Sequence, residues 1–119
     1  MDIYDPVYAF VRTVPHGKVV TYGQVAQCIT GVALTARDVG KAMFYAPADV
    51  PWQRVIGSNG YLLIGKRSPE HQRKQRQILE QEGVVFLSTA DDRVDMSLCQ
   101  WNPGLVGGEI GDLFTEEES

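Results

Sequence analysis

Two threonines placed to cap consecutive helices constrain this fold more than any other feature of the sequence. Thr21 is followed three positions later by Gln24, the spacing of a capping box. Apolar residues at helical spacing follow both Thr21 and Thr35. We expect one helix from Thr21 to about Thr30 and another over residues 36–45. Two helices joined by a short connection outline a helix-turn-helix unit, although two ordinary packed helices would give the same pattern.

Proline marks the start of two further helices. Asp5-Pro6 and Ser68-Pro69 each place a capping side chain before a proline that suits the first helical position. We expect the second of these helices to run to about Glu82, with Gly83 as its stop.

A tight turn follows the two central helices. Gly57-Ser58-Asn59-Gly60 separates two apolar runs, Val55-Ile56 and Tyr61-Leu62-Leu63-Ile64. Asn-Gly between apolar runs is a strong hairpin signal, and a hairpin in this place would form a wing. The sequence therefore predicts an α+β fold, mostly helical, with a winged helix-turn-helix and a short β-hairpin wing.

The charge is unevenly divided along the chain. Residues 1–90 carry ten Lys and Arg against seven Asp and Glu, whereas residues 91–119 carry one Arg against eight acids. A basic body favours a polyanionic partner, which a net charge of −4 would otherwise argue against. The length of 119 residues suits one domain. We expect it to span residues 1–101, with Trp101 as its last core anchor, and a mobile acidic tail over residues 102–119.

Several classes of protein are disfavoured. No run of about 18 apolar residues is present, so no membrane span is expected, and the acidic N-terminus lacks the pattern of a secretory signal. Cys28 and Cys99 form no Cys-x-x-Cys pair and have no histidine cluster beside them, so we expect no metal site, no cofactor and a reducing cytoplasm. We interpret each cysteine as a small buried residue.

Three segments together resemble a known family. They are Val20-Thr21-Tyr22-Gly23-Gln24-Val25-Ala26, Ala36-Arg37-Asp38-Val39-Gly40-Lys41-Ala42 and Pro51-Trp52-Gln53-Arg54-Val55. In this order they are similar to the DNA-binding domain of O6-alkylguanine-DNA alkyltransferases, over roughly residues 3–86. In those repair proteins the third segment reads Pro-Cys-His-Arg-Val, and the cysteine accepts the alkyl group. Trp52 at the cysteine position is the mark of the related alkyltransferase-like proteins, which bind such lesions without removing them.

The chemistry of the third segment independently argues against alkyl transfer. Dealkylation needs a thiolate activated by a base. The indole of Trp52 is no such nucleophile, and Gln53 cannot take up a proton as histidine does. We therefore expect no catalytic residue. On pattern alone Trp52 would be a core anchor; the resemblance instead makes it a wall of the pocket that receives a flipped base.

The resemblance also implies roles for residues of the two central helices. Arg37 would enter the duplex and hold the place of the extruded base, and Tyr22 would press on the phosphate of the target nucleotide. Gly40 and Ala36 would let the helix approach the backbone in the minor groove. The implied DNA-binding residues are Thr21, Tyr22, Ala36, Arg37, Gly40 and Lys41, and the implied lesion pocket consists of Tyr22, Val50, Pro51, Trp52 and Arg54.

Two features qualify these roles. Asp38 stands where alkyltransferases usually have a small residue, and its carboxylate would repel phosphate unless it turns away or pairs with Arg37 or Lys41. Arg54 suits a structural role, donating hydrogen bonds to backbone carbonyls. For Tyr22 and Arg37 the ordinary alternatives are a tyrosine between helices and a solvated surface arginine.

The predicted function is non-enzymatic recognition of O6-alkylguanine in double-stranded DNA by base flipping. The resemblance implies that nucleotide excision repair proteins then act on the flagged lesion. We expect a monomer in the cytoplasm, associated with the nucleoid if the source is bacterial. One alternative is a sequence-specific winged-helix transcription regulator. Another is an enzyme, either an alkyltransferase using Cys28 or Cys99 or a glycosylase.

Overall fold

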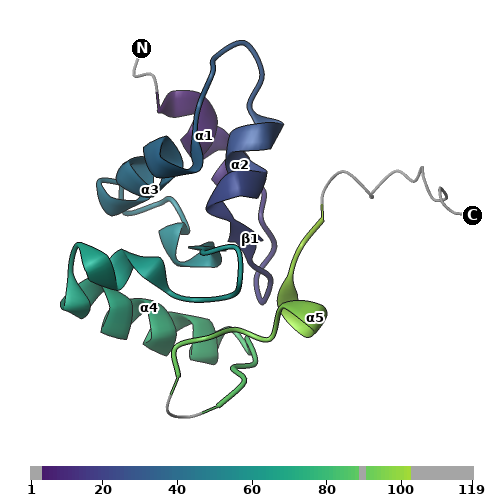
Figure 1. Ribbon diagram of the computed structural model, residues 1–119, viewed down its shortest axis with the longest axis vertical. Helices are drawn as coiled ribbons and strands as arrows, with labels where there is room; N and C mark the ends of the chain where they lie inside the picture. Colours follow the sequence, from purple (N-terminus) through teal and green to yellow (C-terminus); the bar gives the residue numbers. More distant parts are fainter. Residues whose placement is uncertain (1–3, 89–90, 103–119) are drawn as a thin grey trace, which may run out of the picture.

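The computed structural model describes residues 4–88 and 91–102, and within them helices dominate. The longer helices are α1 (Asp5–Val11), α2 (Tyr22–Cys28), α3 (Ala36–Phe44) and α4 (Pro69–Gln81), and a short helix α5 (Met96–Cys99) follows. Two 3-10 turns, η1 (Trp52–Arg54) and η2 (Leu63–Lys66), lie between α3 and α4. In Figure 1, α1, α2 and α3 form the upper part of the molecule, and α4 crosses below them.

Capping boxes open both helices of the central pair. The Thr21 hydroxyl accepts from the backbone N–H of Gln24, and the Gln24 side chain accepts from the backbone N–H of Thr21. Thr35 makes the same reciprocal pair with Asp38. The predicted second and third helices are therefore confirmed, although α2 ends at Cys28, before the expected Thr30.

The two proline-marked helices are also present. α4 begins after Ser68, whose hydroxyl accepts from the His71 N–H, and ends at Gln81. Gly83 follows with a φ of 89°, a backbone conformation that glycine adopts without strain. In α1 the capping position belongs to Tyr4, so Asp5 is the first helical residue and not the cap.

A pair of short parallel strands joins the first half of the chain to the second. β1 (Val20–Thr21) pairs with β2 (Val55–Ile56), with Val20 opposite Val55 and Thr21 opposite Ile56. All four residues are buried. The pair places the start of α2 beside the end of η1, so Tyr22 and Trp52 are carried by neighbouring backbone segments.

The predicted hairpin wing is wrong in its second strand. The turn itself exists, because the Gly57 N–H donates to Tyr61 O and the Gly60 N–H to Gly57 O. Val55-Ile56 pairs with β1 instead, and Leu63–Lys66 forms η2. Tyr61, directly after the turn, bridges to Arg93 in antiparallel fashion, so a later segment and not Val55-Ile56 is its partner.

Two buried clusters form the core. The first lies among α1, α2 and α3 and includes Val7, Val25, Val39 and Met43. The second, which includes Ile56, Leu79 and Val94, lies between α4 and the segment before α5. Trp101 packs on the first cluster as expected, with its ring centroid 6.2 Å from that of Phe10. The predicted tail from residue 103 onward lies outside the described residues.

Candidate nucleic-acid interface

Predicted DNA-binding residues from two helices meet in one surface hollow. It has a volume of about 520 Å³ and is lined by Tyr22 of α2, by Ala36, Arg37 and Gly40 of α3, and by Leu63, Ile64, Lys66 and Arg67 of η2 and the residue after it. The volume falls in the range of about 300–1,000 Å³ that is usual for ligand sites. Helix-turn-helix geometry thus brings four of the six predicted residues to one place.

The electrostatics of this hollow suit a phosphate or a base. Burial raises the pKa of Tyr22 to about 12, although the nearby charge of Arg67 lowers it. The phenol therefore stays protonated at neutral pH and can donate a hydrogen bond to an anionic oxygen. The three cations that line the hollow, Arg37, Lys66 and Arg67, are exposed.

The outer face of α3 is open beside this hollow. Arg37 and Lys41 are exposed and lie one helical turn apart. An atom added at the Cβ position of Gly40 would meet no protein atom within 4 Å. A flat partner can therefore approach the backbone of α3 closely at this point.

Asp38 does not point freely at that partner. Its carboxylate accepts hydrogen bonds from the backbone N–H of Thr35 at 2.9 Å and from the Thr35 hydroxyl at 3.0 Å. The backbone hydrogen bond is the main reason why the pKa of Asp38 is lowered. Asp38 is thus the N3 residue of the α3 capping box, and it also lies near the positive end of the helix.

Trp52 lies outside the Tyr22 hollow and lines two others. One, of about 270 Å³, lies between α3 and α4 and includes Phe44 and His71. The other, of about 370 Å³, includes Val50, Pro51 and Gln53. The predicted lesion pocket is therefore divided: Tyr22 is in one hollow, and Trp52 with Val50 and Pro51 is beside another. The side chain of Val50 itself is only 1% exposed.

Arg54 supports the turn from behind and lines none of these hollows. Its guanidinium donates to Val14 O at 2.8 Å, the backbone-carbonyl bond that the sequence predicted. The Glu82 carboxylate, which the sequence did not point to, receives two further hydrogen bonds from Arg54 at 3.0 Å each. Thr21 is likewise buried and acts as a cap.

Sequence reasoning missed the contribution of η2 and Arg67 to the hollow. The apolar run at residues 61–64 predicts a strand of a wing, and a strand of that kind would not line this hollow. A signal was available in Lys66-Arg67, a pair of cations directly before the α4 cap Ser68. The hydrogen bonds from the Arg67 and Ser68 N–H groups to Ile64 O fold this connection back toward α3.

The two cysteines differ in their surroundings. Cys99 is buried as expected, but Cys28 is exposed, because α2 ends there and the chain leaves toward an exposed segment. No group of three or more metal-ligating side chains is found within residues 4–88 and 91–102. None of the described helices has the length and apolar character needed to cross a bilayer.

Comparison with known proteins gives consistent matches over most of the chain. The family of 6-O-methylguanine DNA methyltransferase DNA-binding domains matches residues 2–84. Alkyltransferase-like protein 1 of Schizosaccharomyces pombe is 37% identical over 107 residues, covering 86% of this chain and 96% of the relative. A DNA base-flipping protein of Vibrio parahaemolyticus is 39% identical over 99 residues, covering 82% of this chain and 93% of the relative.

The fold agrees with a solved structure. A crystal structure of the S. pombe protein Atl1, in complex with damaged DNA containing O6-carboxymethylguanine, superimposes with a TM-score of 0.74 at 36% identity. The match covers 87% of this chain and all of that one, 100%.

Proposed function

This chain belongs to the family of alkyltransferase-like proteins, and we propose that it binds duplex DNA, flips O6-alkylguanine out of the helix and holds it without removing the alkyl group. One observation carries the proposal: Tyr22 and Arg37, from different helices, line the same open hollow. A solved relative is bound to damaged DNA containing O6-carboxymethylguanine, and other relatives are named base-flipping proteins.

In the proposed complex the outer face of α3 lies in the minor groove. Arg37 enters the duplex and occupies the space of the flipped base, while the neutral phenol of Tyr22 donates to the adjacent phosphate. Extrusion costs a few kcal/mol of lost pairing and stacking, and a stacked, hydrogen-bonded guanidinium offsets part of this cost. Lys66 and Arg67, on the other side of the hollow, supply further phosphate contacts.

The bound lesion remains chemically unchanged. Trp52 offers no thiolate, and the neighbouring Gln53 amide donates to Glu82 and is no base. In the proposal the lesion site extends from the hollow at Tyr22 to the turn η1, where Trp52 forms the far wall with Val50 and Pro51 behind it. Arg54 keeps the turn in place from the core side.

Holding a lesion is useful when other proteins act on the complex. The proposal therefore includes hand-over to nucleotide excision repair proteins, by a single copy of this chain acting in the cytoplasm, or at the nucleoid in a bacterium. The acidic segment after residue 102 is a candidate for partner contact.

The experiment that tests the proposal places one O6-methylguanine in two duplexes of unrelated sequence. Lesion recognition predicts the same gain in affinity over the undamaged duplex in both contexts. A transcription regulator would instead favour one sequence, with or without the lesion, and that result would contradict the proposal.

A further inference from the structure

The indole of Trp52 depends on packing for its orientation. It sits in the three-residue turn η1, whose start has no side-chain cap. Among the described residues, none accepts a hydrogen bond from the indole N–H. The side chain packs on the first core cluster and also lines the hollow between α3 and α4. The orientation of the indole therefore depends on a neighbouring side chain that contacts it within the hollow.

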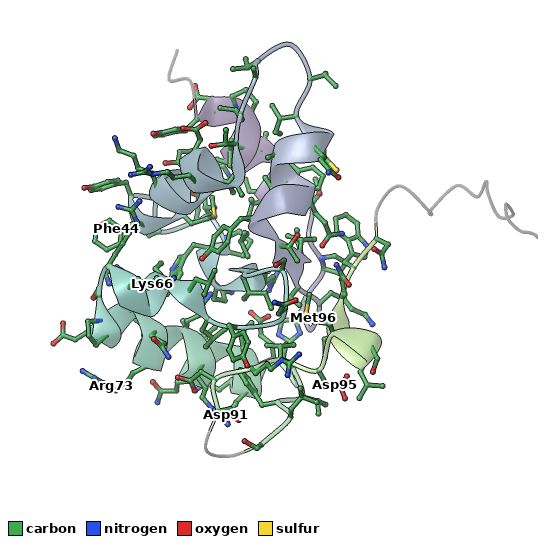
Figure 2. The ribbon with its side chains drawn as sticks, in the orientation of Figure 1. Phe44, Lys66, Arg73, Asp91, Asp95 and Met96 are labelled. Atoms are coloured by element: carbon green, nitrogen blue, oxygen red, sulfur yellow. The ribbon has the colours of Figure 1, made fainter. Side chains whose placement is uncertain are left out.

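His71, which lines the same hollow, is that neighbour. Its ring centroid lies 5.7 Å from that of Trp52, with the planes at 62°, an edge-to-face contact. His71 is held in turn, because its Nδ1 lies 2.9 Å from the hydroxyl of Ser68 and its ring lies 4.9 Å from Phe44 at 35°. In Figure 2, Phe44 lies between α3 above and α4 below.

The contacts of Trp52, His71 and Phe44 continue to the hollow that contains Tyr22. The guanidinium carbon of Arg67 lies 5.9 Å from the centroid of Phe44, over the ring, and Arg67 lines the hollow that contains Tyr22. Arg67, Phe44, His71 and Trp52 therefore form a continuous row of contacts between the two hollows.

We propose that His71 is a positioning residue that fixes the indole of Trp52, through the Ser68 and Phe44 contacts, and so sets the preference for the lesion over guanine. The inference rests on the proposed function, in which Trp52 is the wall of the lesion site. His71 acts through Trp52 and need not touch DNA. Nonspecific affinity should therefore be independent of it.

The test compares His71→Ala with His71→Phe in a Trp101→Phe background, where Trp52 is the remaining tryptophan of the two in the chain. We expect His71→Ala to increase acrylamide quenching of Trp52 fluorescence in the free protein. We also expect it to lower the ratio of affinities for O6-methylguanine and guanine duplexes by roughly 2- to 10-fold, the equivalent of one aromatic pair. His71→Phe keeps a flat ring and should restore both readouts.

Control measurements separate a positioning role of His71 from a general loss of stability. Gln77→Ala, on the exposed face of the same helix, should change neither readout. Urea unfolding reports the overall stability of each variant, and fluorine NMR with 5-fluorotryptophan repeats the measurement with Trp101 in place.

Unchanged quenching in His71→Ala overturns the inference, and so does altered quenching with unchanged lesion preference. If the wild type shows no lesion preference, the proposed function fails. The quenching comparison in the free protein then still decides whether His71 fixes Trp52.

Discussion

The side-chain amide of Gln53 donates a hydrogen bond of 2.9 Å to the carboxylate of Glu82. Arg54 donates two more to the same carboxylate, and the Gly17 N–H approaches it at 3.4 Å. Glu82 therefore ties the end of α4 to η1 and to the loop before β1. The turn that presents Trp52 is anchored on its inner side by one acidic residue.

Replacing Glu82 should destabilise the fold. The side chains of Arg54 and Glu82 are 15% and 7% exposed, and removing one partner of a buried pair leaves the other charge uncompensated. We expect Glu82→Gln to lower the free energy of unfolding by about 3 kcal/mol, measured by urea unfolding at pH 7. Arg12→Gln, which breaks an ion pair with Asp49 whose side chains are 44% and 68% exposed, should cost less. Equal losses would contradict the anchoring role.

The same carboxylate should make stability depend on pH. Burial alone would raise the pKa of Glu82, but hydrogen bonds from Arg54 and Gln53 outweigh it and hold the pKa below the ordinary 4.5. A lowered folded-state pKa stabilises the protein above the unfolded pKa, and this contribution is lost as pH falls through the folded value. Below about pH 4.5 the difference in stability between wild type and Glu82→Gln should therefore shrink. A difference that stays constant to pH 3 would argue against it.

The helix starts and stops could be predicted from sequence because their causes are local. Thr21, Thr35 and Ser68 cap helices with their own neighbours, and Gly83 ends α4 for a conformational reason. The wing could not be predicted in this way because strand pairing depends on distant partners. Asn59-Gly60 does form the expected turn, but the turn does not decide which strands pair. Val55-Ile56 pairs with β1, and Tyr61 forms a bridge with Arg93.

The site was predictable to a similar degree. The family resemblance assigned Tyr22 and Arg37 to one DNA-binding surface, and both residues line the same hollow. The contribution of Arg67 depends on the fold of η2, and the role of Glu82 depends on a contact across 28 positions with Arg54. Neither leaves a periodic pattern in the sequence.

A single cysteine at position 52 should not create an alkyltransferase. In Trp52→Cys, Gln53 still donates to Glu82 and cannot take a proton. We expect no transfer of radiolabelled methyl groups from damaged DNA to this variant. In Trp52→Cys with Gln53→His, Glu82 could accept from the imidazole, and we expect measurable transfer. Efficient transfer by the single variant would contradict this account of the site.

Gly40→Ala should separate stability from DNA binding. An added Cβ meets no protein atom within 4 Å, and alanine favours a helix over glycine by roughly 0.5–1 kcal/mol. The variant should therefore unfold at a higher urea concentration. In the proposed complex the same methyl group stands between α3 and the DNA backbone, so affinity for any duplex should fall. Unchanged affinity would place the DNA elsewhere.

Arg37 and Lys41 offer a matched pair of cations on one face of α3. Arg37→Ala should weaken binding to a lesion duplex by roughly 10-fold, because the guanidinium no longer fills the place of the flipped base. Lys41→Ala removes a cation one turn further along and should weaken binding to damaged and undamaged duplexes alike. Equal effects on both duplexes from Arg37→Ala would make Arg37 an ordinary phosphate contact.

The most direct measurement is the affinity of the wild-type protein for two matched duplexes that differ by one group, guanine or O6-methylguanine at a single position, at one fixed salt concentration. We predict tighter binding to the duplex with O6-methylguanine and recovery of the methyl group intact on the DNA afterwards. Equal affinity for the two duplexes would contradict the central claim that the hollow at Tyr22 and Arg37 serves to recognise the lesion.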